Sequence, residues 1–185
     1  SSGDITFLLA EAVKQGASSW LQTVRDTEAI SACLEAGIGN NVTVEVGGKT
    51  DSLHGEPVRL SGRVTRISDG RFEDSGTVHA GWRFFDGGTT VVIETVEGPT
   101  VALVTTRVGN MSREQFYSLG YRPDDFDVVV AKGVVSPLPA YQPIASELLT
   151  VNTPGATSAD MSSFEYKRVR KSLYPLDINA QYVHD

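Results

Sequence analysis

Histidine and cysteine, the side chains that most often bind zinc, are scarce in this chain. Its 185 residues include one cysteine, and the three histidines are His54, His79 and His184. A zinc site needs three or four His, Cys, Asp or Glu ligands that converge on one point. None of the histidines belongs to an HxH or HExxH pattern, and a set made of Asp51, His54 and Glu56 lacks metal-site spacing. We therefore expect surface or structural histidines, and no metal site or cofactor in the chain itself.

The single cysteine, Cys33, excludes an internal disulfide, which suits a cytoplasmic protein. It lies within an amphipathic helical pattern at residues 29–36, and no histidine that could activate a thiol is nearby in the sequence. We therefore predict that Cys33 is a small residue of the hydrophobic core rather than a nucleophile.

Positive charge is in short supply as well, because the formal net charge is −7. This charge argues against a nucleic-acid-binding surface spread over the whole protein. The one basic cluster is Lys167-Arg-Val-Arg-Lys171, and the aromatic residues around it have no stacking pattern. We expect this cluster to dock on an acidic partner domain.

Long hydrophobic runs are missing too, since none approaches the roughly 20 residues that cross a bilayer. No membrane partner is expected.

The remaining composition is that of an ordinary globular protein. Hydrophobic residues make up 40% of the chain and charged residues 21%, and the length favours one large domain over two small ones. The chain starts with Ser1-Ser-Gly-Asp4, without an initiator Met or a signal region. This start is typical of a cut within a longer protein, and a tag remnant at Ser1-Ser-Gly3 is the alternative.

Helical patterns occur in both halves of the chain. Apolar spacing predicts a helix over residues 4–16 with Asp4 as its cap and Gly16 as its stop. A second helix follows Asp26 and ends at Gly37. Residues 19–24, between the two helices, form a short strand or extend a helix. Ser112 and Gly120 delimit a third helix, and residues 143–149 form a short helix or turn.

Strand patterns dominate the middle of the sequence. Residues 41–46 and 58–67 alternate as half-buried strands, the second with a bulge at Ser61-Gly62. Residues 89–96 and 100–106 form the clearest hairpin, and residues 127–131 are a short apolar run typical of a buried strand. These elements predict an α/β or α+β fold: one domain with a mixed β-sheet, about four helices and a hairpin-rich middle.

Several segments together resemble one known family. The most specific are Thr153-Pro-Gly155 and Tyr174-Pro-Leu-Asp177, which flank the basic cluster. Similar segments are Ser2–Leu9, Ala36–Gly39, Gly47–Lys49 and Val128–Lys132. The chain resembles the carboxy-terminal domain of the microcystinase C (MlrC) family of zinc-dependent hydrolases. The resemblance implies that residues 1–185 are this domain and that the metal is carried by an amino-terminal domain outside the chain.

The resemblance also implies a function for the longer protein. There a zinc-activated water would attack an amide carbonyl, and this domain would shape the substrate cleft. The implied partners are its own amino-terminal metal-binding domain and a small peptide or amide substrate, with oligomers allowed, and the isolated chain would be inactive. The alternative is a non-catalytic binding or interaction domain on the same scaffold. Where many members carry Lys-Ser and then a His-Phe-Arg-like stretch, this chain has Lys132-Gly133 and then Ser136-Pro-Leu-Pro-Ala-Tyr141, so a substrate other than a cyclic peptide is expected.

Six residues are candidates for substrate binding, and no catalytic residue can be assigned. The candidates from the family-like segments are Asp4, Thr6, Gly47, Gly48, Lys49 and Lys132. The glycine pair and its lysine could offer backbone N–H groups and a cation to an anion, or simply end a strand. Lys132 follows an apolar strand, where sites of α/β folds often lie, or it emerges into solvent. The residues after 166 are predicted to form a strap that fastens the domain to its own core or to the rest of its protein.

Overall fold

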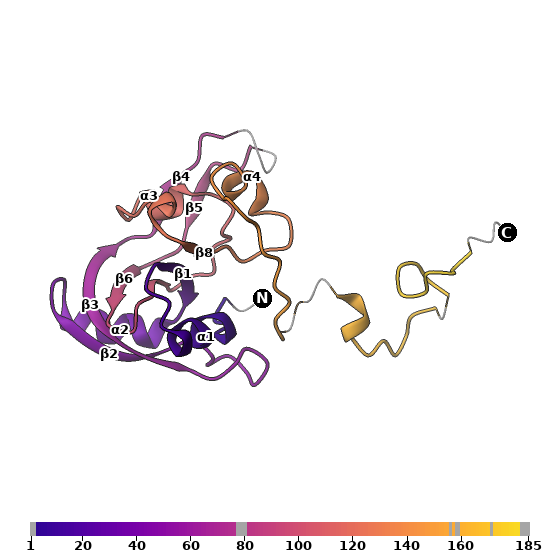
Figure 1. The fold of residues 1–185 in the computed structure, drawn as a ribbon, viewed down its shortest axis with the longest axis horizontal. Helices are drawn as coiled ribbons and strands as arrows, with labels where there is room; N and C mark the ends of the chain where they lie inside the picture. Colours follow the sequence, from indigo (N-terminus) through magenta and orange to yellow (C-terminus); the bar gives the residue numbers. More distant parts are fainter. Residues whose placement is uncertain (1–2, 77–80, 156, 158–159, 171, 182–185) are drawn as a thin grey trace.

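A six-stranded mixed β-sheet organises the fold (Figure 1), which is a computed structural model that describes residues 3–76, 81–155, 157, 160–170 and 172–181. The strand order is β2-β3-β6-β7-β1-β8. The strands are β1 Trp20–Arg25, β2 Asn41–Val46, β3 Val58–Ser68, β6 Thr90–Thr95, β7 Thr100–Val104 and β8 Val128–Val130. Strand β1 pairs in parallel with both β7 and β8, while the other pairs are antiparallel. A small second sheet pairs β4 Arg71–Glu73 with β5 Phe84–Asp86.

Helices cover both faces of the large sheet. Helices α1 Phe7–Gln15 and α2 Thr27–Ala36 contribute to one core cluster, which contains Leu9, Ile30 and Cys33. Helices α3 Glu114–Tyr117 and α4 Leu138–Tyr141 contribute to the other. The predicted single α/β domain with a mixed sheet is therefore confirmed. None of the described helices is long and apolar enough to span a bilayer.

The central strands follow the predicted patterns closely. All five residues of β7 are buried, as are the first four of β6, and the two form the predicted antiparallel hairpin. In β3 the alternation continues without a break from Val58 to Val64. The bulge predicted at Ser61-Gly62 is therefore wrong: the register shifts between Val64 and Arg66. Gly62 instead lies against the backbone of Glu94, where a Cβ would clash.

The first helices begin and end largely as predicted. Gly16 closes α1 in the left-handed conformation with φ 69°, and Asp26 caps α2 by accepting from the Ala29 N–H at 3.0 Å. The cap assigned to Asp4 is wrong, because α1 begins after Thr6, which makes no side-chain cap bond. The Asp4 carboxylate accepts backbone N–H groups of a distant loop instead.

The second half of the chain departs further from prediction. The helix expected at residues 112–120 shrinks to α3, although Ser112 still accepts from the Glu114 N–H at 3.1 Å. Of the short helix or turn predicted at residues 143–149, only a turn at its start forms. Helix α4 lies earlier, directly after Pro137, which is suited to a first helical turn. Strand β8 exists, but it is an edge strand with exposed or half-buried residues. Its apolar run was therefore misread as fully buried.

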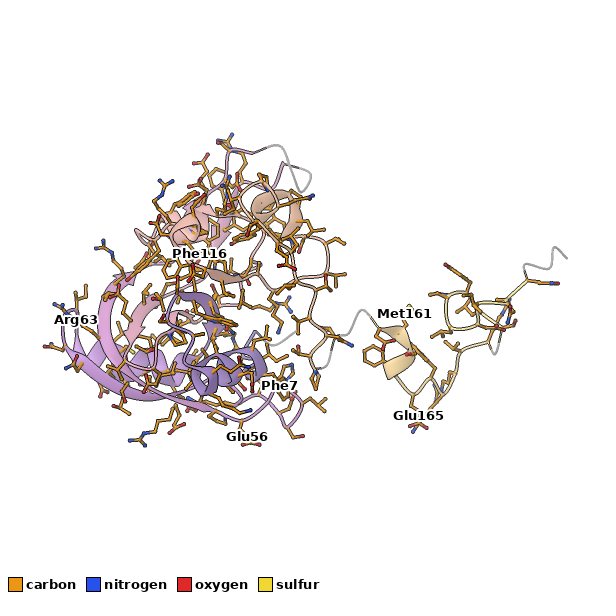
Figure 2. The ribbon with its side chains drawn as sticks, viewed as in Figure 1. Phe7, Glu56, Arg63, Phe116, Met161 and Glu165 are labelled. Atoms are coloured by element: carbon orange, nitrogen blue, oxygen red, sulfur yellow. The ribbon has the colours of Figure 1, made fainter. Side chains whose placement is uncertain are left out.

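The last described segment leaves the body of the protein. In Figure 1 the yellow chain that includes η3 Met161–Ser163 extends away from the sheet, and Figure 2 shows Met161 and Glu165 well apart from Phe7 and Glu56. Tyr174 is 70% exposed and Ile178 is 82% exposed. The prediction of a strap across the domain's own core is therefore wrong. Lys171, His79 and His184 lie outside the described residues.

Candidate functional site

Polar and charged residues follow the ends of all three parallel strands. Arg25 of β1 is opposite Val104 of β7, and Gln22 of β1 is opposite Val130 of β8. The carboxyl ends of these strands therefore meet at one edge of the sheet, the edge at which open α/β sheets bind ligands. Arg107, Asp26 and Lys132 follow β7, β1 and β8. The amino-terminal segment joins this edge, because the Arg25 N–H donates to the Gly3 carbonyl at 2.9 Å.

Asp4 links this edge to the glycine-rich turn after β2. It is 2% exposed, and its Oδ2 accepts from the backbone N–H groups of Lys49 at 3.2 Å and Thr50 at 2.9 Å. Its own carbonyl accepts from the Gly48 N–H at 2.7 Å. Residues more than 40 positions apart in the sequence thus meet, although neither segment predicts the other's position.

The turn needs glycine because the chain packs tightly around it. Gly47 and Gly48 have φ values of 68° and 64°, a region that side chains rarely adopt. A Cβ at Gly47 would lie 2.6 Å from the Thr6 Cγ2 and 2.7 Å from the Asp4 carbonyl oxygen. Five of the six residues predicted from the sequence, Asp4, Thr6, Gly47, Gly48 and Lys49, are therefore in one place.

Thr6 ties the same place to the loop that contains His54. Its hydroxyl donates to the Glu56 carbonyl at 2.7 Å and lies 3.2 Å from the His54 carbonyl. His54 is 1% exposed, and its Nδ1 lies 2.6 Å from the Asp51 Oδ1. This bond, with a second from the Leu53 N–H, lowers the pKa of Asp51. Of the two expectations for His54, a surface or a structural histidine, this burial agrees with the structural one.

No three described His, Cys, Asp or Glu side chains are grouped so that they could hold a metal ion. Asp51 and His54 are in contact, as the sequence grouping suggested. Glu56 takes part only through its backbone carbonyl, which accepts from the Thr6 hydroxyl. Among the described residues, Asp51 and His54 are therefore a pair and not part of a set of three possible metal ligands.

Asp26 is a central residue of this region that the sequence identified only as a helix cap. It is 5% exposed. Its Oδ1 caps α2, its Oδ2 accepts from the Gly47 N–H at 2.8 Å, and the Lys49 ammonium lies 3.0 Å from Oδ2. Three strands separate β2 from β1 in the sheet, so the curved β2–β3 hairpin in Figure 1 folds over α2 to return Gly47 to this point.

Lys49 is held by the protein's own acids. Its ammonium pairs with Asp26 and, at 3.2 Å, with Glu28. Burial alone would lower the pKa of Lys49, but the hydrogen bonds and charges of the two acids together raise it. Because the Gly47, Gly48 and Lys49 donors are already engaged, the geometry favours a structural turn over an open anion site.

Lys132 differs from Lys49 in lacking such partners. Its backbone N–H donates to Asn110 Oδ1 at 3.1 Å, and the Asn110 amide donates to Gln115 at 2.9 Å. Its ammonium nitrogen is buried without a hydrogen-bond partner in the described structure. Burial lowers the pKa of Lys132 and the Arg107 charge lowers it further, while the Asp4 charge opposes both. The alternative that Lys132 simply emerges into solvent is therefore wrong.

Arg107 lies against Gly3, the residue before Asp4, and was missed by sequence reasoning. A Cβ at Gly3 would lie 3.4 Å from the Arg107 Cγ and 3.2 Å from the Arg25 Cβ, so the arginine stem packs on the amino-terminal segment. The signal that could have found Arg107 is its position just after a buried strand that pairs in parallel with β1. We call Asp4, Arg107 and Lys132 the strand-end charge cluster.

Two open surface hollows lie away from this cluster. One of about 430 Å³ is lined by β4 and β5, and one of about 260 Å³ is lined mainly by β2 and β3. Neither is lined by a buried charged side chain. The strand-end charge cluster is therefore the better candidate, because the Asp4 side chain and the Lys132 ammonium nitrogen are buried and the backbones of both residues are fixed by hydrogen bonds.

Comparisons with known proteins agree with this fold. The MlrC C-terminus family matches residues 1–168. A crystal structure of a protein from Mesorhizobium sp. BNC1, provisionally named a metallopeptidase, is similar with a TM-score of 0.81 and 26% sequence identity. The match covers 98% of this chain and 36% of that chain, so this chain spans about a third of the solved relative's length. No curated protein matched the chain.

Proposed function

Because the chain belongs to the MlrC C-terminus family, we propose that it is the substrate-cleft and scaffold domain of a zinc-dependent amidohydrolase or peptidase. The observation that carries this proposal is the strand-end charge cluster at the carboxyl edge of β7, β1 and β8. A buried lysine, an arginine and a carboxylate at this edge can orient a polar substrate, and they contribute no ligand set of their own. The metallopeptidase name of the solved relative supports the peptidase class.

In this proposal the zinc belongs to the remainder of the longer protein. The solved relative extends well beyond the matched third of its length, which leaves room for a metal-binding domain. When bound there, zinc supplies a Lewis acid and an activated water. The residues of this chain bind and orient the substrate beside it: Lys132 by charge, and Asp26 and Asp4 by fixing the backbone that surrounds the site.

The extended segment supports the same partnership. Phe164, Tyr166 and Tyr174 are 38%, 42% and 70% exposed, although aromatic side chains usually gain free energy from burial. The solved relative matches 98% of this chain, so most of the extended segment is shared with a longer protein. We propose that this segment docks on the rest of its own protein, and a second copy of the chain is the other possible occupant.

The role of the extended segment can be tested by one deletion in two proteins. Removal of residues 161–185 should leave the melting temperature of the 185-residue chain unchanged, because this segment lies away from the core. The same deletion in the full-length protein should lower the melting temperature. Equal effects in both proteins would contradict docking on the remainder, and a dimer lost on deletion would identify a second copy as the occupant.

The function itself is tested in the full-length protein. Elemental analysis after dialysis should find zinc, and peptide mixtures should yield new amino groups only when zinc is present. Lys132→Met should lower turnover at least tenfold, since a charged contact to the transition state is worth about 3 kcal/mol. Lys14→Met is the matched control, because Lys14 is an exposed lysine that pairs with Glu11.

The second candidate function is a non-catalytic binding domain on the same scaffold. The observation that favours it is that the donors of Gly47 and Lys49 are taken by the carboxylates of Asp26 and Asp4, and the Gly48 N–H by the backbone carbonyl of Asp4. A full-length protein that holds zinc but releases no amino groups from any peptide mixture would support this candidate. Unchanged turnover in Lys132→Met would instead reject only the placement of the site.

A further inference from the structure

We propose that the remainder of the longer protein docks on the open edge of β8, where a strand of the remainder pairs with Val129 and extends the six-stranded sheet. The receiving surface consists of β8 and the apolar chain that follows it, residues 128–151, and we call it the β8 edge surface. This inference rests on the proposed function for the existence of a remainder, which the length of the solved relative supports.

The first observation is the open side of β8. Strand β8 is at the end of the strand order and pairs only with β1 among the described residues. The Val128 N–H points toward β1, because it donates to the Ser19 carbonyl at 3.0 Å. Successive N–H groups of a strand point to opposite sides, so the Val129 N–H points away from β1. Backbone groups at such an open edge can pair with a further strand.

The second observation is that this edge lacks protecting charges. Natural edge strands often carry charged side chains that prevent pairing with other chains. The opposite edge strand, β2, has an exposed Glu45 that pairs with Arg59 at 3.8 Å, whereas β8 has three valines. Because β8 is short, a new strand could form only a few backbone bonds with it. Apolar side chains around the strand would therefore supply most of the binding free energy.

The third observation is that such side chains are present. Of the 20 large hydrophobic side chains that are exposed among the described residues, seven lie in the β8 edge surface. Val134, Val135 and Leu149 are 70%, 67% and 78% exposed. Lys132 and Glu147 are the only charged residues in the 24 residues of this stretch, and the Lys132 ammonium nitrogen is buried. A group of exposed apolar residues with so little charge is typical of a protein interface.

The β8 edge surface has a firm base. Val129, Ala140 and Ile144 pack against the core cluster that contains Phe116 and Tyr141. In Figure 1 the orange chain through α4 stays on the body of the domain, unlike the yellow segment that extends away. A partner that docks here would therefore contact a surface that the fold already positions.

The charges favour the remainder over a second copy as the occupant. A second copy would bring another net charge of −7 against the first, which disfavours association. Asp124, Asp125 and Asp127 directly precede β8, so two copies paired through this strand would also bring two acidic turns into one interface. The chain spans only 36% of the solved relative, and a permanent contact between parts of one protein is the kind that uses an apolar surface.

The position of this surface agrees with the proposed site. Strand β8 ends two residues before Lys132 of the strand-end charge cluster. A remainder docked on β8 would lie beside the carboxyl edge of the sheet, where the proposed function places the substrate. Strand pairing at Val129 would then fix how the remainder is placed relative to Lys132.

Hydrogen exchange at single-residue resolution tests the pairing directly. The amide of Val129 is followed in the 185-residue chain and in the full-length protein. In the full-length protein it should exchange more slowly by a factor of roughly 100 or more, because the added strand accepts its N–H. The Val128 amide is the internal control, since it is bonded toward β1 in both proteins and should change much less.

A charge placed on the surface tests the apolar contact. Val135→Asp should lower the melting temperature of the full-length protein by roughly 3 °C or more and speed the exchange of Val129, because docking would bury an unpaired carboxylate. The same change should alter the melting temperature of the 185-residue chain by only about 1 °C. Val96→Asp is the matched control, because Val96 is 81% exposed and lies outside the β8 edge surface.

Three results would overturn the inference. The first is equal exchange of Val129 in the two proteins, and the second is an equal effect of Val135→Asp and Val96→Asp on the full-length protein. The third is a 185-residue chain that forms dimers, protects Val129 and loses both properties in Val135→Asp, which would identify a second copy as the occupant.

These results are distinct from a failure of the proposed function. Peptide hydrolysis by a full-length protein in which Val129 exchanges freely would reject only the docking edge. A protected Val129 in a full-length protein without hydrolase activity would support the docking and reject the proposed function.

Discussion

Replacing Asp26 with alanine should cost the protein about 3–5 kcal/mol of unfolding free energy, because one carboxylate makes three separate links. Loss of the α2 cap costs about 1 kcal/mol. The hydrogen bond from the Gly47 N–H to a charged acceptor is worth about 1.5–3 kcal/mol. The Lys49 ammonium would lose its buried partner, which adds to the cost. Asp26 is 5% exposed, so water cannot easily replace these contacts.

The change is measured by urea denaturation followed by circular dichroism. Thermal denaturation gives a second measurement. For a chain of this size a loss of 1 kcal/mol lowers the melting temperature by about 2–4 °C, so we expect the melting temperature of Asp26→Ala to fall by roughly 6–12 °C or more. Asp26→Asn should fall between the wild type and Asp26→Ala, since one oxygen acceptor remains but the charge is lost.

Glu28→Ala is the matched control. Glu28 also pairs with Lys49, but its side chain is 79% exposed, and surface ion pairs contribute about 0–1 kcal/mol. A loss below 1 kcal/mol in Asp26→Ala, or an equal loss in Glu28→Ala, would refute the reasoning, because it would mean that Asp26 does not hold Gly47 and α2 together.

Three further predictions concern the same core. Gly48→Ala should destabilise by several kcal/mol, since a Cβ would lie 2.6 Å from a Glu56 backbone atom; Gly16→Ala, with φ 69° and open space, should cost only about 1 kcal/mol, and equal thermal shifts would contradict this. The Cys33 thiol, whose pKa burial raises to about 11, should react with Ellman's reagent at pH 8 only after unfolding. Lys132→Met should match or exceed the wild type in thermal stability at pH 7. Because the pKa of Lys132 is lowered in the folded state, the wild type gains stability as the pH rises toward 10. The difference in melting temperature between Lys132→Met and the wild type should therefore shrink at high pH.

The fold was predictable wherever apolar residues formed a regular pattern or a continuous run along the sequence. Strands β6 and β7 are continuous apolar runs joined by a short turn, and Asp26 and Gly16 carry cap and stop signals that depend only on local chemistry. The short helices were less predictable. The third helix is only four residues long, and its position is set by packing of Phe116, which is fully buried, so helix-forming sequence spacing overestimated its length.

The edge position of β8 was also outside the reach of the sequence. Its three valines would be an apolar run in a central strand and in an edge strand alike. Only the strand order shows that β8 has β1 on one side and no partner strand among the described residues on the other. The contacts of Asp4 could not be predicted from the sequence either, because an aspartate at this position also suits a helix cap. It binds the turn after β2 instead because the curved hairpin brings that turn back over α2.

The strand-end charge cluster is the clearest case of a site that topology creates. Asp4, Arg107 and Lys132 are separated by about a hundred residues or by a whole strand and helix, so no local pattern links them. They meet because β1 is flanked by two parallel strands, β7 and β8, whose connection carries α3 across the sheet. The sequence could identify Lys132 as the end of a strand, but the burial of its ammonium and the charge effect of Arg107 on it depend on that crossover. A substitution that disturbs the crossover, rather than the charges, should therefore disperse all three at once.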